Sequence, residues 1–184
     1  LVVTGHGAAE VAATVAVHAR ADAVRLVHNA DFAAPNGVSV LAARAHLRAP
    51  ALLVMADHLV DPQLYARVAG HGGAAALALG VDRRLDHPWI DPDDVTRVWT
   101  RGAQIQAIGK HLDPYNGYDT GVFLITHALM EALAAMPVPG LSDGVRALAA
   151  QGRAHAVETG DLGWIDVDDP RALAIAQDWM AARL

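Results

Sequence analysis

The chain has 184 residues, of which 53% are hydrophobic and 5% aromatic, and this size suits one compact domain over residues 1–184 with a substantial core. It contains no cysteine, which excludes disulfides and thiolate metal sites. The formal net charge of −6 argues against a nucleic-acid partner, and the lack of a run of roughly 18 uncharged apolar residues argues against membrane contact. We therefore expect a cytoplasmic protein.

Strand and helix patterns alternate through the first part of the chain, which predicts parallel strands joined by helical crossovers. Asp61 before Pro62 has the sequence pattern of a helix N-cap followed by proline in the first turn. The expected strands cover residues 1–4, 24–27, 51–56 and 74–80, and the expected helices cover residues 8–20, 39–47 and 62–68.

The second part of the chain has a different sequence pattern, because polar and apolar residues alternate on both sides of Arg101-Gly102. This pattern predicts a β-hairpin over residues 95–108. The elements expected after it are strands 117–126, 154–158 and 164–167, and helices ending near 136, over 142–150 and over 171–183. Together these elements predict the α/β class, with three α/β/α layers around a mostly parallel mixed sheet.

The run Ala51–Ala56 is wholly apolar and is followed by Asp57. Such a run predicts a strand buried on both faces of a parallel sheet, with the acid at the carboxyl edge where open α/β folds bind ligands. His58 follows directly, and we expect it either to line the cleft or to form an orienting hydrogen bond to a neighbouring loop.

A second acidic cluster, Asp166, Asp168 and Asp169, comes just before the last predicted helix. Alternate residues of an extended segment share a face, so Asp166 and Asp168 point the same way and could bind a hard divalent cation together with Asp57. Asp169 before Pro170 is expected to cap the helix. The alternative for Asp166 and Asp168 is that both are solvated carboxylates.

Lys110 is the only lysine of the chain and ends the predicted hairpin. Asp119, Thr120 and Gly121 open the next apolar strand, so an acid and a lysine can project into one cleft and hold a hydroxyl and a phosphate. The alternative is a solvated lysine and an ordinary turn.

Asn36, Gly37 and Ser39 precede a predicted helix. Ser39 could cap that helix, and Gly37 would let the backbone approach an anionic ligand. Gly5-His6-Gly7 also follows a strand, but Glu10 stands where a dinucleotide-binding turn has its third glycine.

Five stretches, in this order, resemble the nucleotidyltransferase family with the glycosyltransferase-A-like fold, and within it the inositol-1-phosphate and phosphocholine cytidylyltransferases. They are residues 27–29 with 36–39, then 54–58, 108–110, 119–123 and 164–170. Ala56 stands where a glycine is common in that family. The family also opens with a strand and a Gly-rich loop, Leu-Ala-Ala-Gly-x-Gly-x-Arg, which residues 1–184 lack, so we expect an N-terminally truncated domain.

The resemblance implies specific roles for these residues. Asp57, Asp166 and Asp168 would bind Mg²⁺, and Lys110 would contact a phosphate during catalysis. Asp119, with Thr120 and Gly121, would face the hydroxyls of the acceptor. Asn36, Gly37 and Ser39 would lie against the nucleotide.

The implied reaction moves CMP from CTP onto a phosphorylated alcohol such as inositol 1-phosphate and releases pyrophosphate. Acceptors left open are a sugar 1-phosphate, phosphocholine and the molybdopterin cofactor, and a non-catalytic nucleotide-binding or interaction domain is the alternative of another class. Relatives of this kind are sometimes fused to a CDP-alcohol phosphotransferase domain.

Overall fold

A computed structural model describes residues 1–18, 20–71 and 75–183. The helices are α1 (Ala8–Ala16), α2 (Gly37–Ala42), α3 (Pro62–Ala69), α4 (His127–Ala134), α5 (Leu141–Ala149) and α6 (Pro170–Ala181), with 3-10 helices η1 (Ala21–Ala23) and η2 (Arg44–His46). The strands are β1 (Val2–Thr4), β2 (Leu26–His28), β3 (Ala51–Val54), β4 (His58–Val60), β5 (Leu77–Asp82), β6 (Arg97–Arg101), β7 (Gln104–Gly109), β8 (Gly117–Ile125), β9 (Ala154–Glu158) and β10 (Trp164–Asp166). None of these helices combines the length and the apolar character that crossing a membrane requires.

The main sheet has six strands in the order β3-β8-β5-β9-β7-β6, and β6 also pairs with β8. The α/β class is confirmed, but the expectation of a mostly parallel sheet is wrong. Among the described strands of this sheet only β5 and β9 pair in parallel. The strand β8 runs antiparallel to β3, β5 and β6, and β7 runs antiparallel to β6 and β9. Hydrophobic alternation predicts the strands but not the direction of their partners.

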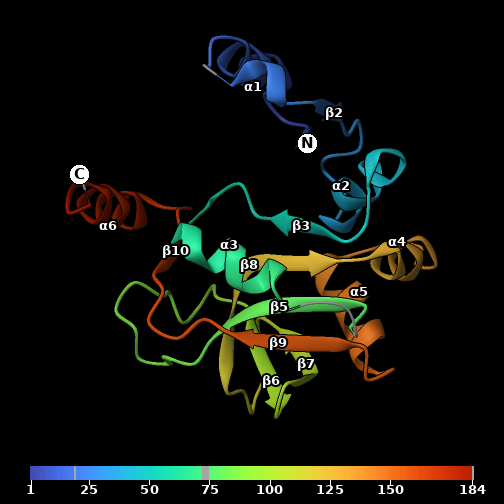
Figure 1. Cartoon of the computed structure of the whole chain (residues 1–184), viewed down its shortest axis with the longest axis vertical. Helices are drawn as coiled ribbons and strands as arrows, with labels where there is room; N and C mark the ends of the chain where they lie inside the picture. Colours follow the sequence, from blue (N-terminus) through green and yellow to red (C-terminus); the bar gives the residue numbers. More distant parts are fainter. Residues whose placement is uncertain (19, 72–74, 184) are drawn as a thin grey trace.

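Helices cover both faces of the sheet, as expected for three layers (Figure 1). Leu77 and Leu79 of β5 pack in one core cluster with residues of α4 and α5, whereas Ala78 packs with Leu64 and Val68 of α3 on the opposite face. All six residues of β5 are buried. The strand buried on both faces is therefore β5.

The apolar run expected to be buried on both faces forms β3 instead, at one edge of the sheet. Its residues alternate between half-buried and exposed, and Leu52 and Val54 are among the exposed large apolar side chains. The burial expected for this run is therefore wrong: β3 is an edge strand that pairs with β8 alone among the described strands, and one of its faces is left exposed. Asp57 nevertheless follows the strand end, as predicted.

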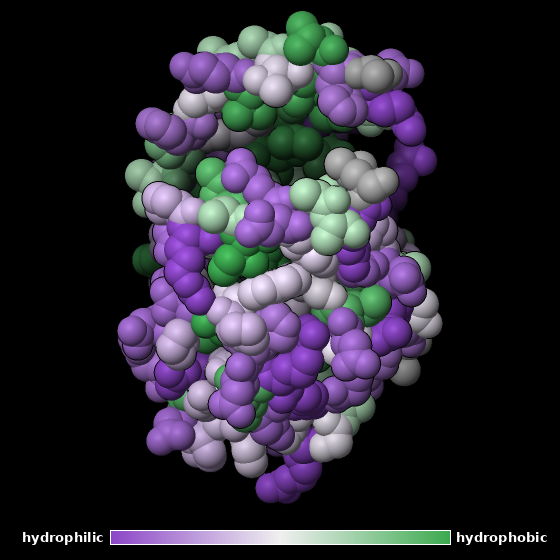
Figure 2. All heavy atoms as spheres, turned by 90° about the vertical axis from the view of Figure 1, so that its left-hand side faces the viewer, coloured by the Kyte–Doolittle hydropathy of each residue, from purple (hydrophilic) through white to green (hydrophobic). Residues whose placement is uncertain are grey.

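The N-terminal segment forms its own two-stranded parallel sheet from β1 and β2, set apart from the main sheet (Figure 1). Seen from the side, apolar surface gathers in a hollow below this segment (Figure 2). The first helix is shorter than predicted and ends at Ala16. The second begins at Gly37 rather than at Ser39, so Ser39 lies inside the helix and does not cap it.

Candidate active site

The acidic residues singled out in the sequence meet at one pocket of about 320 Å³ between the main sheet and the β4–β10 pair. Seven of the ten predicted site residues line it: Asn36, Asp57, Lys110, Asp119, Gly121, Asp166 and Asp168. The other three, Gly37, Ser39 and Thr120, lie outside this lining. The pocket therefore gathers residues from distant parts of the chain.

The antiparallel pairing of β4 with β10 builds the centre of the pocket. Its register sets Asp166 directly opposite His58, next to Asp57. Ligand atoms of these three residues lie within 4.8 Å of one another. The sequence did not predict β4, whose three residues are too few for a periodic signal. The proximity of His58 and Asp166 could therefore not be predicted and is seen only in the structure.

A second group extends the acidic cluster on the other side of Asp166. Ligand atoms of Asp94, Asp166 and Asp168 also lie within 4.8 Å of one another. Asp166 thus belongs to both groups, which brings the three predicted metal-binding aspartates into one continuous cluster. Asp94 was not singled out in the sequence, because it lies in an acidic loop, Asp91-Pro92-Asp93-Asp94, that reads as solvated surface.

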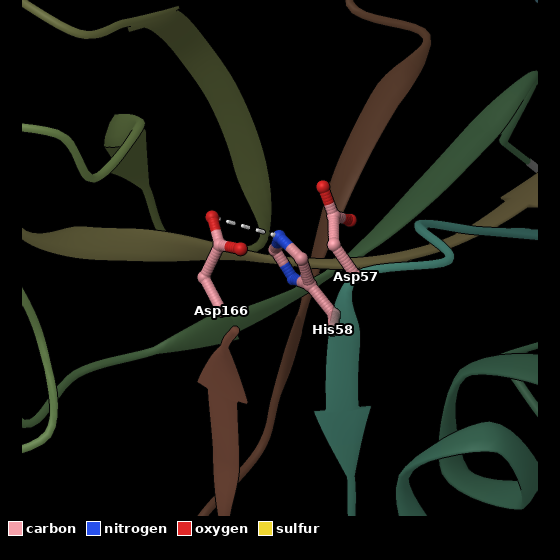
Figure 3. Close-up of side chains that lie close together, drawn as sticks. All are labelled: Asp57, His58 and Asp166. Carbon is pink, nitrogen blue, oxygen red and sulfur yellow. Dashed lines mark ion pairs between the residues drawn. The ribbon is translucent and has the colours of Figure 1, made fainter. Parts of the chain in front are cut away.

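His58 occupies the middle of this cluster, between the carboxylates of Asp57 and Asp166 in the view of Figure 3. Its Nδ1 lies 2.9 Å from the carbonyl oxygen of Thr120, and its Nε2 lies 3.3 Å from Oδ2 of Asp166. The ring is stacked on Trp164 with centroids 5.8 Å apart. His58 lines the pocket, which is the first of the two expectations, and its hydrogen-bond partner Thr120 lies in strand β8 rather than in a loop.

The electrostatics of Asp166 favour a cation in the cluster. Burial raises the pKa of Asp166, His58 lowers it, and the carboxylates of Asp57 and Asp168 raise it further. Oδ1 of Asp166 is buried and has no hydrogen-bond partner among the described residues. A buried carboxylate oxygen without a partner is costly unless something binds it, and carboxylates suit Mg²⁺, so the donor set fits a divalent ion.

Lys110 lines the same pocket and forms an ion pair with Asp94. Both side chains are about half exposed, so the pair is held weakly and an anion can compete for the ammonium group. The predicted convergence of Lys110 and Asp119 on one cleft therefore agrees with the geometry.

Asp119 and Gly121 shape the pocket from β8. Oδ1 of Asp119 accepts a hydrogen bond of 2.8 Å from the Gly121 amide. Burial raises the pKa of Asp119 to about 6, against the lowering effect of that bond and of His58. Thr120 points the other way, is fully buried and donates to the carbonyl of Gly80 at 2.8 Å, so its contacts are structural.

The Asn36 segment contributes one side chain to the pocket. Oδ1 of Asn36 accepts a hydrogen bond of 2.9 Å from the Leu141 amide. Gly37 packs against the carbonyl of Pro139, where an added Cβ would lie 2.3 Å from the oxygen. Ser39 accepts a hydrogen bond of 3.0 Å from Asn29.

Solved structures share this fold. The inositol-1-phosphate CTP transferase from T. maritima superposes with a TM-score of 0.83 at 23% identity, covering 97% of this chain and 74% of that one. A putative glucose-1-phosphate thymidylyltransferase from Bacillus anthracis follows with a TM-score of 0.77 at 13% identity, covering 96% of this chain and 74% of that one. The chain therefore has the nucleotide-sugar transferase fold of the nucleotidyltransferases.

Sequence similarity leads to a narrower group. The chain is 36% identical over 182 residues to the bifunctional IPC transferase and DIPP synthase of Rubrobacter xylanophilus, a match that covers 97% of this chain and 40% of that protein. The Aquifex aeolicus protein of the same name is 24% identical over 145 residues, covering 79% of this chain and 32% of that protein. The chain thus spans at most about two fifths of these relatives, and no family profile matches it. These comparisons confirm its resemblance to nucleotidyltransferase enzymes, in particular the inositol-1-phosphate cytidylyltransferases.

Proposed function

We propose that the chain is the catalytic domain of a magnesium-dependent cytidylyltransferase that moves CMP from CTP onto inositol 1-phosphate. The observation that carries the proposal is the joint position of Asp57, Asp166 and Asp168 in one pocket with Lys110 and Asp119. The names of the relatives support the choice of an inositol phosphate and CTP.

The carboxylates of Asp57, Asp166 and Asp168 would hold Mg²⁺. When bound, the ion neutralises negative charge on the phosphates of the nucleotide. Unit charges of like sign about 4 Å apart repel by roughly 4 kcal/mol at an effective dielectric of 20, so two polyanions cannot be aligned in this acidic pocket without a counter-charge. The orphaned oxygen of Asp166 supports this assignment.

The acceptor supplies the nucleophile itself. A phosphomonoester has a second pKa near 6 and is largely dianionic at neutral pH, so its oxygen can attack the α-phosphorus without a general base. The bond from the α-phosphorus to the bridging oxygen breaks and pyrophosphate leaves. Lys110 would bind a phosphate in exchange for Asp94, and Asp119 would orient the hydroxyl groups of the acceptor. The task of the protein is thus alignment and charge compensation.

On the nucleotide side, Asn36 lines the pocket and would contact CTP directly. Gly37 and Ser39 would act through the shape of the segment that carries Asn36. Among the described strands, β1 and β3 each pair on one side only.

A hydroxyl-rich acceptor is favoured over phosphocholine. A choline group needs an aromatic cage. Trp89, Phe123 and Trp164 line the pocket whereas Tyr115 and Tyr118 do not, so the preference for a hydroxyl-rich acceptor rests on the names of the relatives. Tyr118 is buried and donates to the carbonyl of Leu85 at 3.0 Å. A sugar 1-phosphate or the molybdopterin cofactor could contact Asp119 in the same way. An assay of pyrophosphate release with each acceptor distinguishes these from inositol 1-phosphate.

The test is pyrophosphate release by the protein that includes the Gly-rich loop, with CTP and inositol 1-phosphate in the presence of Mg²⁺. Because Asp57 lies in the carboxylate cluster, Asp57→Asn is expected to lower kcat by at least a hundredfold. Asp22→Asn, on the exposed η1 helix far along the chain from the pocket, is the control and keeps full activity.

Two outcomes would contradict the proposal. Unchanged turnover in Asp57→Asn would refute the metal assignment. Nucleotide binding without pyrophosphate release, for any triphosphate paired with inositol 1-phosphate, phosphocholine or a sugar 1-phosphate, would favour the non-catalytic binding domain.

The second activity in the names of the relatives suggests in addition that this domain works beside a CDP-alcohol phosphotransferase domain.

A further inference from the structure

We propose that His58 is itself a metal ligand, so that the ion at this site is bound by one imidazole nitrogen and two carboxylates and the site favours a transition-metal dication such as Mn²⁺ over Mg²⁺. The inference rests on the proposed function only in assuming that a divalent ion binds beside Asp57 and Asp166. It adds a ligand of another chemical type to the carboxylates of Asp57 and Asp166.

The hydrogen bond on the far side of the ring fixes which nitrogen faces the cluster. Nδ1 of His58 lies 2.9 Å from the carbonyl oxygen of Thr120, and because a carbonyl only accepts, Nδ1 carries the proton. A neutral imidazole then has its lone pair on Nε2. Histidines that bind metals commonly donate their other ring N–H to a backbone carbonyl in this way.

Nε2, which would be deprotonated when a dication binds, faces the acidic oxygens at a suitable distance. Nε2 lies 3.3 Å from Oδ2 of Asp166, and a carboxylate oxygen of Asp57 completes a group whose atoms lie within 4.8 Å of one another. Two ligands on an ion at about 2.1 Å are separated by roughly 3.0 Å in an octahedron and 3.4 Å in a tetrahedron. The observed separation lies between these values.

The ring is held in place before any ion binds. Its side chain is only 12% exposed and is stacked on Trp164, whose Nε1 donates to Asp82 at 2.8 Å. Gly121 also lies close to the ring, at a φ of 74°, where an added Cβ would be 2.4 Å from Nδ1 of His58. A glycine is therefore required for the histidine to occupy this position, as expected for a ligand that the fold orients.

A nitrogen ligand changes the preference of the site. Water and carboxylate oxygens suit Mg²⁺, whereas imidazole binds first-row transition metals better. The predicted consequence is that Mn²⁺ binds at least tenfold more tightly than Mg²⁺, and that His58→Gln removes most of this difference while the aspartates still hold Mg²⁺.

The test is pulsed EPR of Mn²⁺ bound to the full chain, together with competition by Mg²⁺. We expect ¹⁴N coupling from a directly bound imidazole, its replacement by ¹⁵N coupling in protein labelled with ¹⁵N-histidine, and its loss in His58→Gln. His18→Gln, at an exposed position after α1, is the matched control and keeps the coupling. The labelled wild-type protein gives a result even if the His58 variant does not fold.

Mn²⁺ bound without nitrogen coupling would overturn the inference, because the ion would then be held by carboxylates alone and His58 would only bond to Asp166. That outcome leaves the proposed cytidylyltransferase intact. Failure of wild-type protein to bind Mn²⁺ would also overturn it, whereas the proposed function is judged separately by Mg²⁺-dependent pyrophosphate release.

Discussion

Burial in the pocket changes the pKa of individual side chains, and Asp119 is the clearest case. Burial raises its pKa from 3.8 to about 6, and the nearby carboxylate of Asp166 adds to the effect. Its pKa in the unfolded chain is near the ordinary value, so the folded state binds more protons between about pH 4 and pH 6. The free energy of unfolding therefore falls as pH rises through this interval.

This residue-scale effect predicts the behaviour of Asp119→Asn, which keeps the acceptor for the Gly121 amide but cannot ionise. Relative to the variant, the wild-type protein should lose stability between pH 4 and pH 6.5 and change no further above that. Urea unfolding in EDTA at several pH values measures the difference. The control is Asp113→Asn, at an exposed position, whose free energy of unfolding should change with pH just as that of the wild type does. The same pH dependence in Asp119→Asn and in the wild type would contradict the prediction.

Between elements, a buried ionic network connects β5 to β10. Asp82, at the end of β5, is fully buried and accepts hydrogen bonds from Arg84 at 2.8 and 2.9 Å and from Nε1 of Trp164 at 2.8 Å. Burial raises the pKa of Asp82, but these bonds lower it by more. Because Trp164 begins β10 and Asp166 ends it, Asp82 anchors the strand that delivers a predicted metal ligand.

Asp82→Ala is therefore expected to cost about 3–5 kcal/mol of unfolding free energy, since it leaves a guanidinium group and an indole N–H without their buried acceptor. Urea unfolding at pH 7 measures the loss. Asp86→Ala, an exposed acid four residues later, should change stability by no more than about 0.5 kcal/mol. A similar small change in Asp82→Ala would mean that the network does not anchor β10.

Across the whole molecule, negative charge is concentrated where anionic substrates would bind. The chain carries a net charge of −6, and the pocket is lined by Asp57, Asp91, Asp94, Asp119, Asp166, Asp168 and Asp169 against Lys110 and Arg171. Two cations cannot compensate seven acids and a triphosphate. Divalent ions, which the carboxylate cluster could bind, would supply the missing positive charge under the proposed function.

The corresponding prediction concerns CTP binding measured by titration calorimetry. With Mg²⁺ present, CTP should bind at least tenfold more tightly than in EDTA, since each unshielded pair of like charges about 4 Å apart opposes binding by roughly 4 kcal/mol. Raising the salt concentration should reduce this difference in CTP affinity between Mg²⁺ and EDTA. Equal affinity with and without Mg²⁺ would show that the nucleotide avoids the carboxylates.

Elements with strong local signals were predictable from the sequence. Asp61 caps α3 through the Gln63 amide, Asp169 caps α6 through the Ala172 amide, and the β6–β7 hairpin turns at Arg101 and Gly102, because caps and turns depend on residues a few positions apart. The direction of the strand pairs depends on chain segments far apart, which explains the wrong expectation of a mostly parallel sheet.

The sequence by itself determined most of the apolar strands, the caps at Asp61 and Asp169, and the aspartates that follow strand ends, since these are properties of neighbouring residues. Only the tertiary structure decided that β4 pairs with β10, that Asp94 engages Lys110 and that His58 lies between two carboxylates. The physical reason is distance along the chain: His58 and Asp166 become neighbours through a strand register that no local pattern encodes.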